Sequence, residues 1–215
     1  MATIYERFRP KTWADVIGQP KAIGIIDSLR SSVGLAGQVY WITGPSGTGK
    51  STIGRLIASE IADDWAVEEL NGADVSLDVV RQWEDRCRFR PLGMGQHCII
   101  VNEAHALSGR VVSRLLTTLE KDNVQLTSTW IFTTTTDGAN LFDENFDSAP
   151  FLSRCQEIAL TSQGLSPLFA TRLREIANEL NLNGQPIEKY QRLVKDCKNN
   201  FRLCLQRIAS GCMKG

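Results

Sequence analysis

The fold of this chain is decided by one stretch of sequence, Gly44-Pro45-Ser46-Gly47-Thr48-Gly49-Lys50-Ser51-Thr52. The stretch matches the pattern G-x-x-x-x-G-K-[ST]. A short β-prone run, QVYWIT at residues 38–43, comes directly before it, and a helical pattern over residues 50–63 follows it. Strand, glycine-rich turn and helix in this order are the context that the pattern requires, and they form the first unit of an α/β fold.

The residue types in this stretch suit the binding of phosphate. Glycines permit positive φ and let backbone N–H groups close around phosphate oxygens. The N-terminus of the following helix favours an anion. In this pattern the lysine, here Lys50, reaches the β- and γ-phosphates, and the hydroxyl of Ser51 binds Mg²⁺. A chance glycine turn is the alternative, but the spacing and the flanking strand and helix favour an ATP and Mg²⁺ site over residues 44–52.

The alternation of strands and helices continues beyond this unit. We expect strands at residues 38–43, 65–70, 98–101, 129–135 and 155–160, and helices at 20–32, 50–63, 77–89 and 108–120. The run at 98–101 is continuously apolar, which is typical of a parallel strand buried on both faces. The sequence therefore predicts an α/β fold with a five-stranded parallel sheet covered by helices on both sides.

The pattern changes after residue 160. Only helices are expected there, at residues 167–180, 187–197 and 200–210, and a region of this size has little core of its own. We predict two domains, an α/β nucleotide-binding domain over residues 1–162 and a three-helix lid domain over residues 163–215.

Two polar residues follow the apolar run at 98–101. Glu103 is placed to orient or deprotonate an attacking water, as a general base does. The residue usual at the position of Asn102 is Asp, whose charge holds the hydrated Mg²⁺. Asn accepts a hydrogen bond from a metal-bound water but brings no charge, so we expect weaker Mg²⁺ binding and slower hydrolysis. The substitution Asn102→Asp tests this, because a large gain in turnover would show that the native site is attenuated.

The composition bounds the class of protein. Lys and Arg number 24, as do Asp and Glu, so no net charge drives the chain onto nucleic acid or a membrane surface. The six cysteines form no Cys-x-x-Cys pair, which favours free thiols in a reducing compartment over a zinc site. No apolar run approaches the length of a membrane span. We expect a soluble protein of the cytoplasm with no membrane partner, and association with the nucleoid or with a viral replication complex stays open.

Several segments outside the phosphate loop are similar to those of one known family. Residues 5–19, YERFRPKTWADVIGQ, resemble its box YRPKTFDDVVGQ, and residues 115–120, LLTTLE, resemble its helix LLKTLEE. Ser153-Arg154-Cys155 matches its Ser-Arg-Cys motif, and residues 200–203, NFRL, resemble its sensor-2 segment. The family is the AAA+ clamp-loader ATPases of DNA replication, which includes the bacterial tau/gamma subunit and the small subunits of replication factor C. The resemblance covers residues 3–211.

The resemblance implies further site residues. Those around the adenine would be Tyr5, Arg9, Pro10, Val16 and Ile17. Thr136 would contact the γ-phosphate or the water, Arg202 would lie over the phosphates of its own subunit, and Asn71 would control the orientation of Glu103. Arg154 would be a finger inserted into the ATP site of a neighbouring subunit. Taken singly, Arg154 and Arg202 would be interpreted as solvated surface groups, and the run of threonines at 133–136 as a β-branched strand. The order and spacing of these residues, matched to one family, favour the family roles.

The resemblance also implies partners. These are other AAA+ subunits in a homo- or hetero-oligomer, a sliding clamp and primer–template DNA. Arginines in the regions that face the DNA in the family are Arg81, Arg86, Arg88, Arg90, Arg110 and Arg114. Asp78, Glu84 and Asp85 interleave with the first four of these, so a solvated face of mixed charge is an equal alternative to DNA contact.

Family subunits carry a third helical collar domain, whereas this sequence ends after the lid. We therefore expect either a fragment or a pared-down relative.

Three functions are compatible with these residues. The first is a Mg²⁺-dependent ATPase of DNA replication or repair, with clamp loading as its leading task. The second is an ATP-binding scaffold with little hydrolysis, which Asn102 favours. The third is another AAA+ machine that processes DNA, such as a Holliday-junction motor. A small-molecule kinase would need neither Ser-Arg-Cys nor a sensor arginine.

Overall fold

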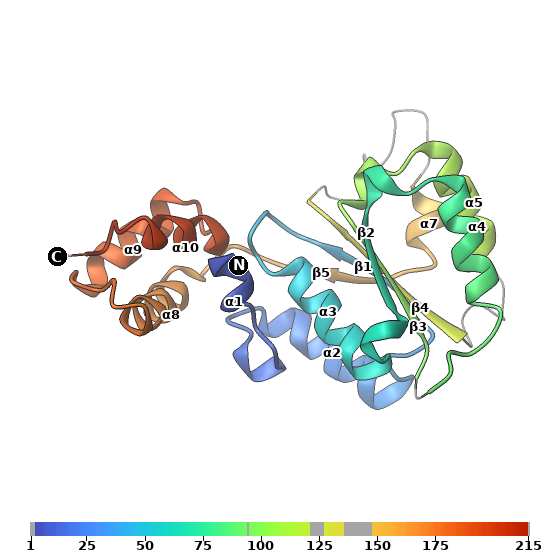
Figure 1. Cartoon of the computed structure of the whole chain (residues 1–215), viewed down its shortest axis with the longest axis horizontal. Coiled ribbons are helices and arrows are strands. Elements are labelled where there is room, and N and C mark those ends of the chain that lie inside the picture. The colour runs from blue at the N-terminus through green and yellow to red at the C-terminus, as the bar shows by residue number, and fades with distance from the viewer. Residues whose placement is uncertain (1–2, 94, 121–126, 136–147, 215) are drawn as a thin grey trace.

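The fold is built on one parallel β-sheet. The computed structural model describes residues 3–93, 95–120, 127–135 and 148–214. The strands are β1 (Val39–Thr43), β2 (Val67–Asn71), β3 (His97–Asn102), β4 (Ser128–Thr134) and β5 (Gln156–Ala159). They pair in parallel in the order β2-β3-β4-β1-β5 (Figure 1). The predicted α/β fold with a five-stranded parallel sheet is confirmed.

Helices cover both faces of the sheet. One face packs against α2 (Pro20–Ser32) and α3 (Lys50–Ile61), and the other against α4 (Leu77–Arg86), α5 (Gly109–Leu119) and α7 (Ala149–Leu152). Side chains of a strand point alternately to the two faces. On β1, for example, Trp41 packs on the α4, α5 and α7 side and Tyr40 on the α2 and α3 side. Burial on both faces explains why β1, β3 and β4 are almost continuously apolar or β-branched.

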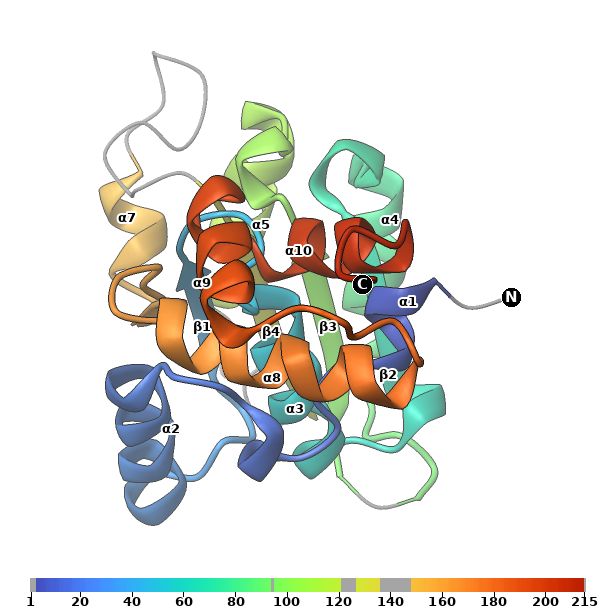
Figure 2. The ribbon, with the colours of Figure 1, turned by 90° about the vertical axis from the view of Figure 1, so that its left-hand side faces the viewer.

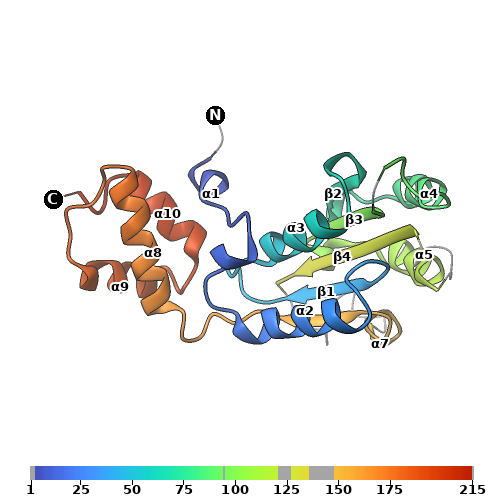
Figure 3. The same cartoon turned by 90° about the horizontal axis from the view of Figure 1, so that it is seen from below.

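The C-terminal helices form a cluster of their own. They are α8 (Ser166–Glu179), α9 (Ile187–Asp196) and α10 (Phe201–Ala209), and their shared core includes Phe169, Leu173 and Tyr190. Figure 3 places this cluster beyond one end of the sheet, beside α1 (Ile4–Arg7), and in the end-on view of Figure 2 it stands in front of the strands. Tyr5 and Phe8 from the N-terminal segment pack against it. Residues 5–19, called the opening box below, therefore connect the C-terminal helices to the α/β part of the chain.

The element boundaries differ from the expectation in a few places. The strand expected at 65–70 begins at Val67 because Asp64–Ala66 forms a 3-10 turn. The helix expected at 77–89 ends at Arg86, and the one expected at 50–63 ends at Ile61. The two four-residue helices α1 and α7 were not expected, because four residues are too few to show a helical period. No helix in the described ranges is long and apolar enough to span a membrane.

Candidate nucleotide-binding site

The phosphate loop follows β1 and ends at the first turn of α3. Gly44, Gly47 and Gly49 have φ values of 143°, 79° and 104°, which residues with a Cβ rarely adopt. Lys50 is only 7% exposed, and its Nζ donates to the carbonyl oxygens of Gly44 at 2.8 Å and Pro45 at 3.1 Å. Burial lowers the pKa of Lys50, and the charge of Arg202 lowers it further, whereas that of Glu103 raises it. The loop therefore holds a buried cation at its centre, where an anion would be bound.

Close packing explains two of the glycines in this loop. A Cβ on Gly44 would lie 2.7 Å from the carbonyl oxygen of Leu160, after β5. A Cβ on Gly47 would lie 2.3 Å from Oδ1 of Asn200. That oxygen caps α10 by accepting a hydrogen bond from the backbone N–H of Leu203 at 3.1 Å. The loop is thus packed between the end of the sheet and the N-terminus of α10.

A group of oxygen atoms lies beside the first turn of α3. The hydroxyls of Ser51 and Thr133 donate to Oδ1 of Asn102 at 2.8 and 2.9 Å. Asn102 and Thr133 come together because their neighbours two residues earlier, Ile100 and Ile131, pack on the α3 side of the sheet and strand side chains repeat with a period of two. Hydroxyl and amide oxygens are ligands that Mg²⁺ accepts, usually with several waters retained. The residues present therefore fit a hydrated Mg²⁺ held at Ser51 and Asn102.

A series of charged side chains continues from Asn102 across α3 to the N-terminal segment. Nδ2 of Asn102 donates to Oε1 of Glu69 at 2.6 Å, and Arg55 donates to both oxygens of Glu69 at 2.7 and 3.1 Å. Arg55 also pairs with Glu6 at 3.4 Å, and Glu6 in turn accepts from Arg9. Hydrogen bonding to Arg9 holds the pKa of Glu6 below its usual value, against the opposing effect of its burial. The strand tip and the opening box therefore share one polar network.

Two adjoining cavities, of about 300 and 580 Å³, flank this network. Three residues line both of them, namely Tyr5, Arg9 and Arg202. The guanidinium carbon of Arg202 lies 5.0 Å from the centre of the Tyr5 ring, within the range of a cation–π contact. The smaller cavity has an apolar side made by the opening box and the C-terminal helices, and the larger one is lined mainly by polar groups. An adenine and a triphosphate require these two environments side by side.

Most of the site residues expected from the sequence lie around these cavities. Those lining the smaller cavity are Tyr5, Arg9, Pro10, Val16, Ile17, Gly47, Thr48, Gly49, Thr52 and Arg202. Those lining the larger one are Tyr5, Arg9, Ser51, Asn71, Asn102, Glu103 and Arg202. Gly44, Pro45, Ser46 and Lys50 belong to the same loop but line neither cavity. Thr136 lies outside the described residues.

The backbone at Glu103 makes a sharp turn at the end of β3. Its φ of 51° is in the left-handed region, and its side chain is 49% exposed. Gly72, after β2, lies so close that a Cβ there would be 2.6 Å from the carbonyl oxygen of Glu103. His105 lies 3.6 Å from the Glu103 carboxylate and 3.0 Å from the hydroxyl of Thr134. The turn thus directs an accessible carboxylate into the larger cavity.

A comparison with known families decides the identity of this fold. Residues 40–162 match the family described as ATPase family associated with various cellular activities (AAA). The chain belongs to the AAA family of ATPases. Nucleotide binding is a general property of this family.

Individual relatives of this AAA chain are distant. Over 141 residues it is 25% identical to the DNA polymerase III subunit tau of Bacillus subtilis (strain 168), a match that covers 55% of this chain and 25% of tau. This match supports the resemblance read from the sequence. The RuvB Holliday junction branch migration motor of Thermotoga maritima superposes with a TM-score of 0.67 at 19% identity, over 94% of this chain and 64% of RuvB. A mutant RuvB structure gives 0.69 at 18% identity, over 94% and 65%. The chain therefore spans a quarter of tau and less than two thirds of RuvB, and the RuvB likeness shows the fold alone.

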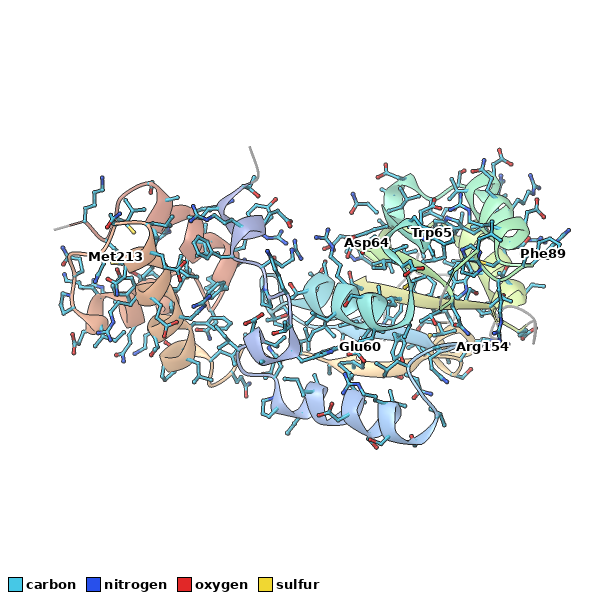
Figure 4. All side chains as sticks on the ribbon, turned by 60° about the horizontal axis from the view of Figure 1, so that its bottom comes forward. Glu60, Asp64, Trp65, Phe89, Arg154 and Met213 are labelled. Carbon is cyan, nitrogen blue, oxygen red and sulfur yellow. The ribbon has the colours of Figure 1, made fainter. Side chains whose placement is uncertain are left out.

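Arg154 lies apart from both cavities of the AAA fold. Figure 4 places it far from Met213 in the C-terminal cluster. Its guanidinium pairs with Glu120, at the end of α5, and donates to the carbonyl oxygen of Pro150. Arg154 therefore does not reach the nucleotide site of its own chain.

Sequence reasoning missed several residues that line the AAA site. The apolar ones in the smaller cavity are Phe8, Phe169, Phe201 and Leu205. Three of these come from the C-terminal helices, and no local sequence pattern predicts that these helices contact the phosphate loop. The missed charged residues of the network are Glu6, Arg55 and Glu69. Glu69 had one available signal, since it is a carboxylate two residues from the polar end of a strand.

Proposed function

We propose that this chain is a Mg²⁺-dependent ATPase subunit that acts in DNA replication or repair, with the loading of a sliding clamp as its leading task. One observation carries the ATPase part: the phosphate loop, the Ser51–Asn102 oxygens and Glu103 lie around two adjoining cavities that are both lined by Arg202. The match to the tau subunit of DNA polymerase III supports the DNA part.

The proposed roles follow from position. Lys50 and the N-terminus of α3 bind the phosphates, and Ser51 and Asn102 hold Mg²⁺, which neutralises charge on the phosphates when bound. Glu103 orients or deprotonates the attacking water, and Asn71, across the same cavity, restrains Glu103. Thr136 retains its proposed contact with the γ-phosphate or the water. Arg202 contacts the phosphates from α10 and so couples the state of the nucleotide to the C-terminal helices.

We further propose that residues 1–162 and 163–215 are the nucleotide-binding domain and its lid. The separate apolar core of α8, α9 and α10 supports this division.

The partners proposed are other AAA+ subunits, into whose ATP sites Arg154 reaches, together with a clamp and primer–template DNA in the cytoplasm or nucleoid. Among the described residues, four of the six arginines considered for DNA contact have carboxylate partners: Arg81, Arg86, Arg88 and Arg114. The two others, Arg90 and Arg110, are both exposed and are the first candidates for contact with phosphate.

Two alternatives have specific support. Asn102 in place of an acidic residue favours an ATP-binding scaffold with little hydrolysis. The superposition on RuvB allows a branch-migration motor, since that fold serves a Holliday-junction machine in Thermotoga maritima.

Steady-state ATP turnover with Mg²⁺, with and without primer–template DNA, tests the proposal. The substitution Glu103→Gln supplies the blank, and we expect it to retain ATP binding while turnover falls by about 10²-fold or more. Turnover that rises with DNA and vanishes in the blank supports the ATPase. Turnover equal to the blank, despite measurable ATP binding, would leave the scaffold or a subunit that awaits its partners.

A second assay separates the two DNA machines. Fluorescent clamp retained on primed circular DNA after ATP addition supports clamp loading. ATP-driven movement of a four-way junction, without such retention, would support the motor instead.

A further inference from the structure

The amide of Asn102 has two ends of equal shape and opposite hydrogen-bonding character. Oδ1 accepts from Ser51 and Thr133, at 2.8 and 2.9 Å, whereas Nδ2 donates to Glu69 at 2.6 Å. Only the oxygen end is useful to a cation, because an N–H group repels it. Any function of Asn102 in holding Mg²⁺ therefore depends on what prevents the amide from rotating by a half turn.

Glu69 is the group that prevents it. An ionised carboxylate only accepts hydrogen bonds, and this one is fixed by two hydrogen bonds from Arg55, at 2.7 and 3.1 Å. If the amide rotated, Oδ1 of Asn102 would face the Glu69 carboxylate oxygen at the 2.6 Å now spanned by a hydrogen bond. Two acceptors at that distance repel each other, so only the orientation with Oδ1 toward Ser51 is favourable.

The same geometry argues against an aspartate at position 102. The side chains of Asp and Asn have nearly the same shape, so Asp would place a carboxylate oxygen about where Nδ2 now lies, next to Oε1 of Glu69. Like charges at such contact are strongly unfavourable in a partly buried site. Glu69 and an acidic residue 102 are therefore mutually exclusive, whereas Glu69 and Asn102 are complementary.

We propose that Glu69 is a positioning residue for the metal side of the nucleotide site, and that the Glu69–Asn102 pair takes the place of the single aspartate usual at the end of this strand. This inference rests on the proposed function, because it concerns the same site. It reverses the expectation from the sequence alone: Asn102→Asp by itself weakens metal binding, and does so because Glu69 is present.

Four proteins test the inference: wild type, Asn102→Asp, Glu69→Gln and the double variant. The readout is the affinity of Mn²⁺ for the whole chain in complex with the slowly hydrolysed analogue ATPγS, measured from the electron paramagnetic resonance signal of free Mn²⁺. Because substitutions around metal ligands typically cost 10–100-fold in affinity, we expect each single variant to bind Mn²⁺ about tenfold more weakly. The double variant restores one carboxylate beside one amide, and we expect it to recover most of the loss.

Glu68→Gln is the matched control. Glu68 is the preceding residue of β2, on the opposite face of the sheet, where it pairs with Arg86. We expect its Mn²⁺ affinity to equal that of the wild type. Recovery in the double variant also shows that neither single substitution acts merely by unfolding the chain.

Two failures are distinguishable. If the wild type binds ATPγS and Mn²⁺ but the two substitutions act additively, or Asn102→Asp alone tightens Mn²⁺ binding, the inference about Glu69 is overturned and the proposed function stands. If the wild type binds no nucleotide at all, the proposed function falls and the inference falls with it.

Discussion

Gly47 shows how one residue links the phosphate loop to the C-terminal helices. Its φ is 79°, and a Cβ there would meet Asn200 Oδ1 at 2.3 Å. Gly47→Ala therefore adds backbone strain, of order 1–3 kcal/mol, and pushes the cap of α10 away from the loop. We expect a lower melting temperature and weaker ATP binding, measured by thermal denaturation and by titration with a fluorescent ATP analogue.

Gly24 is the matched control for this substitution. It lies within α2, and a Cβ there would meet nothing within 4 Å. Gly24→Ala should stabilise the chain by about 0.5–1 kcal/mol, because alanine is the better helix former. Equal effects of the two substitutions on stability and on ATP affinity would contradict the proposed contact between the loop and α10.

At the scale of elements, Glu60 connects three of them. Glu60 is labelled in Figure 4 and lies on α3. It accepts hydrogen bonds from Arg30 of α2, at 2.7 and 3.0 Å, and from the indole of Trp13 in the 3-10 turn Trp13–Asp15. The hydrogen bond from Arg30 lowers the pKa of Glu60 from its usual 4.5, and that from Trp13 lowers it further, against the effect of burial.

This shift predicts a dependence of stability on pH. A carboxylate with a depressed pKa in the folded state stabilises the fold above its unfolded pKa, and the contribution is lost as the pH falls from about 4.5 through the lower folded value. Glu60→Gln should therefore reduce the free energy of unfolding at pH 7 by at most about 1 kcal/mol, since the pair is about one third exposed. The difference from wild type should shrink at pH 3. Urea unfolding at both pH values measures it, and an unchanged difference at pH 3 would contradict the assignment.

A second link between elements is Gln19, which is 2% exposed. Its side chain donates to the carbonyl of Thr161 at 2.8 Å and accepts from the N–H of the same residue at 3.0 Å. It also approaches the carbonyl of Thr48 in the phosphate loop at 3.5 Å. Gln19 thus connects the loop to the segment between β5 and α8.

Gln19→Asn tests this connection. Asn tolerates the left-handed φ of 61° at this position but is one methylene too short to span it. Each of the two hydrogen bonds to Thr161 contributes about 0.5–1.5 kcal/mol. Losing them should therefore give faster amide hydrogen exchange at Thr161 and weaker ATP binding. Gln163→Asn, an exposed residue of the same segment, is the control. Unchanged exchange at Thr161 would show that the connection carries no stability.

What the sequence predicts well at this scale is what local pattern encodes. The apolar run before Asn102 predicts β3 because both faces of a central parallel strand are buried. The phosphate loop that begins at Gly44 predicts where β1 ends and where α3 begins. The pair of Glu69 and Asn102 depends instead on β2 lying beside β3, and Glu69 is opposite Ile100 rather than any polar residue. Phe169 and Phe201 enter the site only through the packing of the C-terminal helices. Contacts between segments distant in the sequence could therefore not be predicted from local sequence patterns.

At the scale of the whole molecule, the position of Arg154 predicts that the nucleotide site it completes belongs to another subunit. Its pairing with Glu120 keeps it on the surface of the α/β part, remote from both cavities of its own chain. If Arg154 completes the site of a second copy, mixing Arg154→Ala chains with Glu103→Gln chains should restore ATP turnover that neither variant has alone. After random mixing, about a quarter of the interfaces join an intact Glu103 to an intact Arg154. An arginine finger in trans contributes about 10³-fold or more, so partial recovery of ATP turnover is measurable above either variant, and Arg154→Ala mixed with itself is the control. Absence of recovery, with both variants folded and binding ATP, would contradict action between copies of this chain and direct the search to a different AAA+ subunit as the partner.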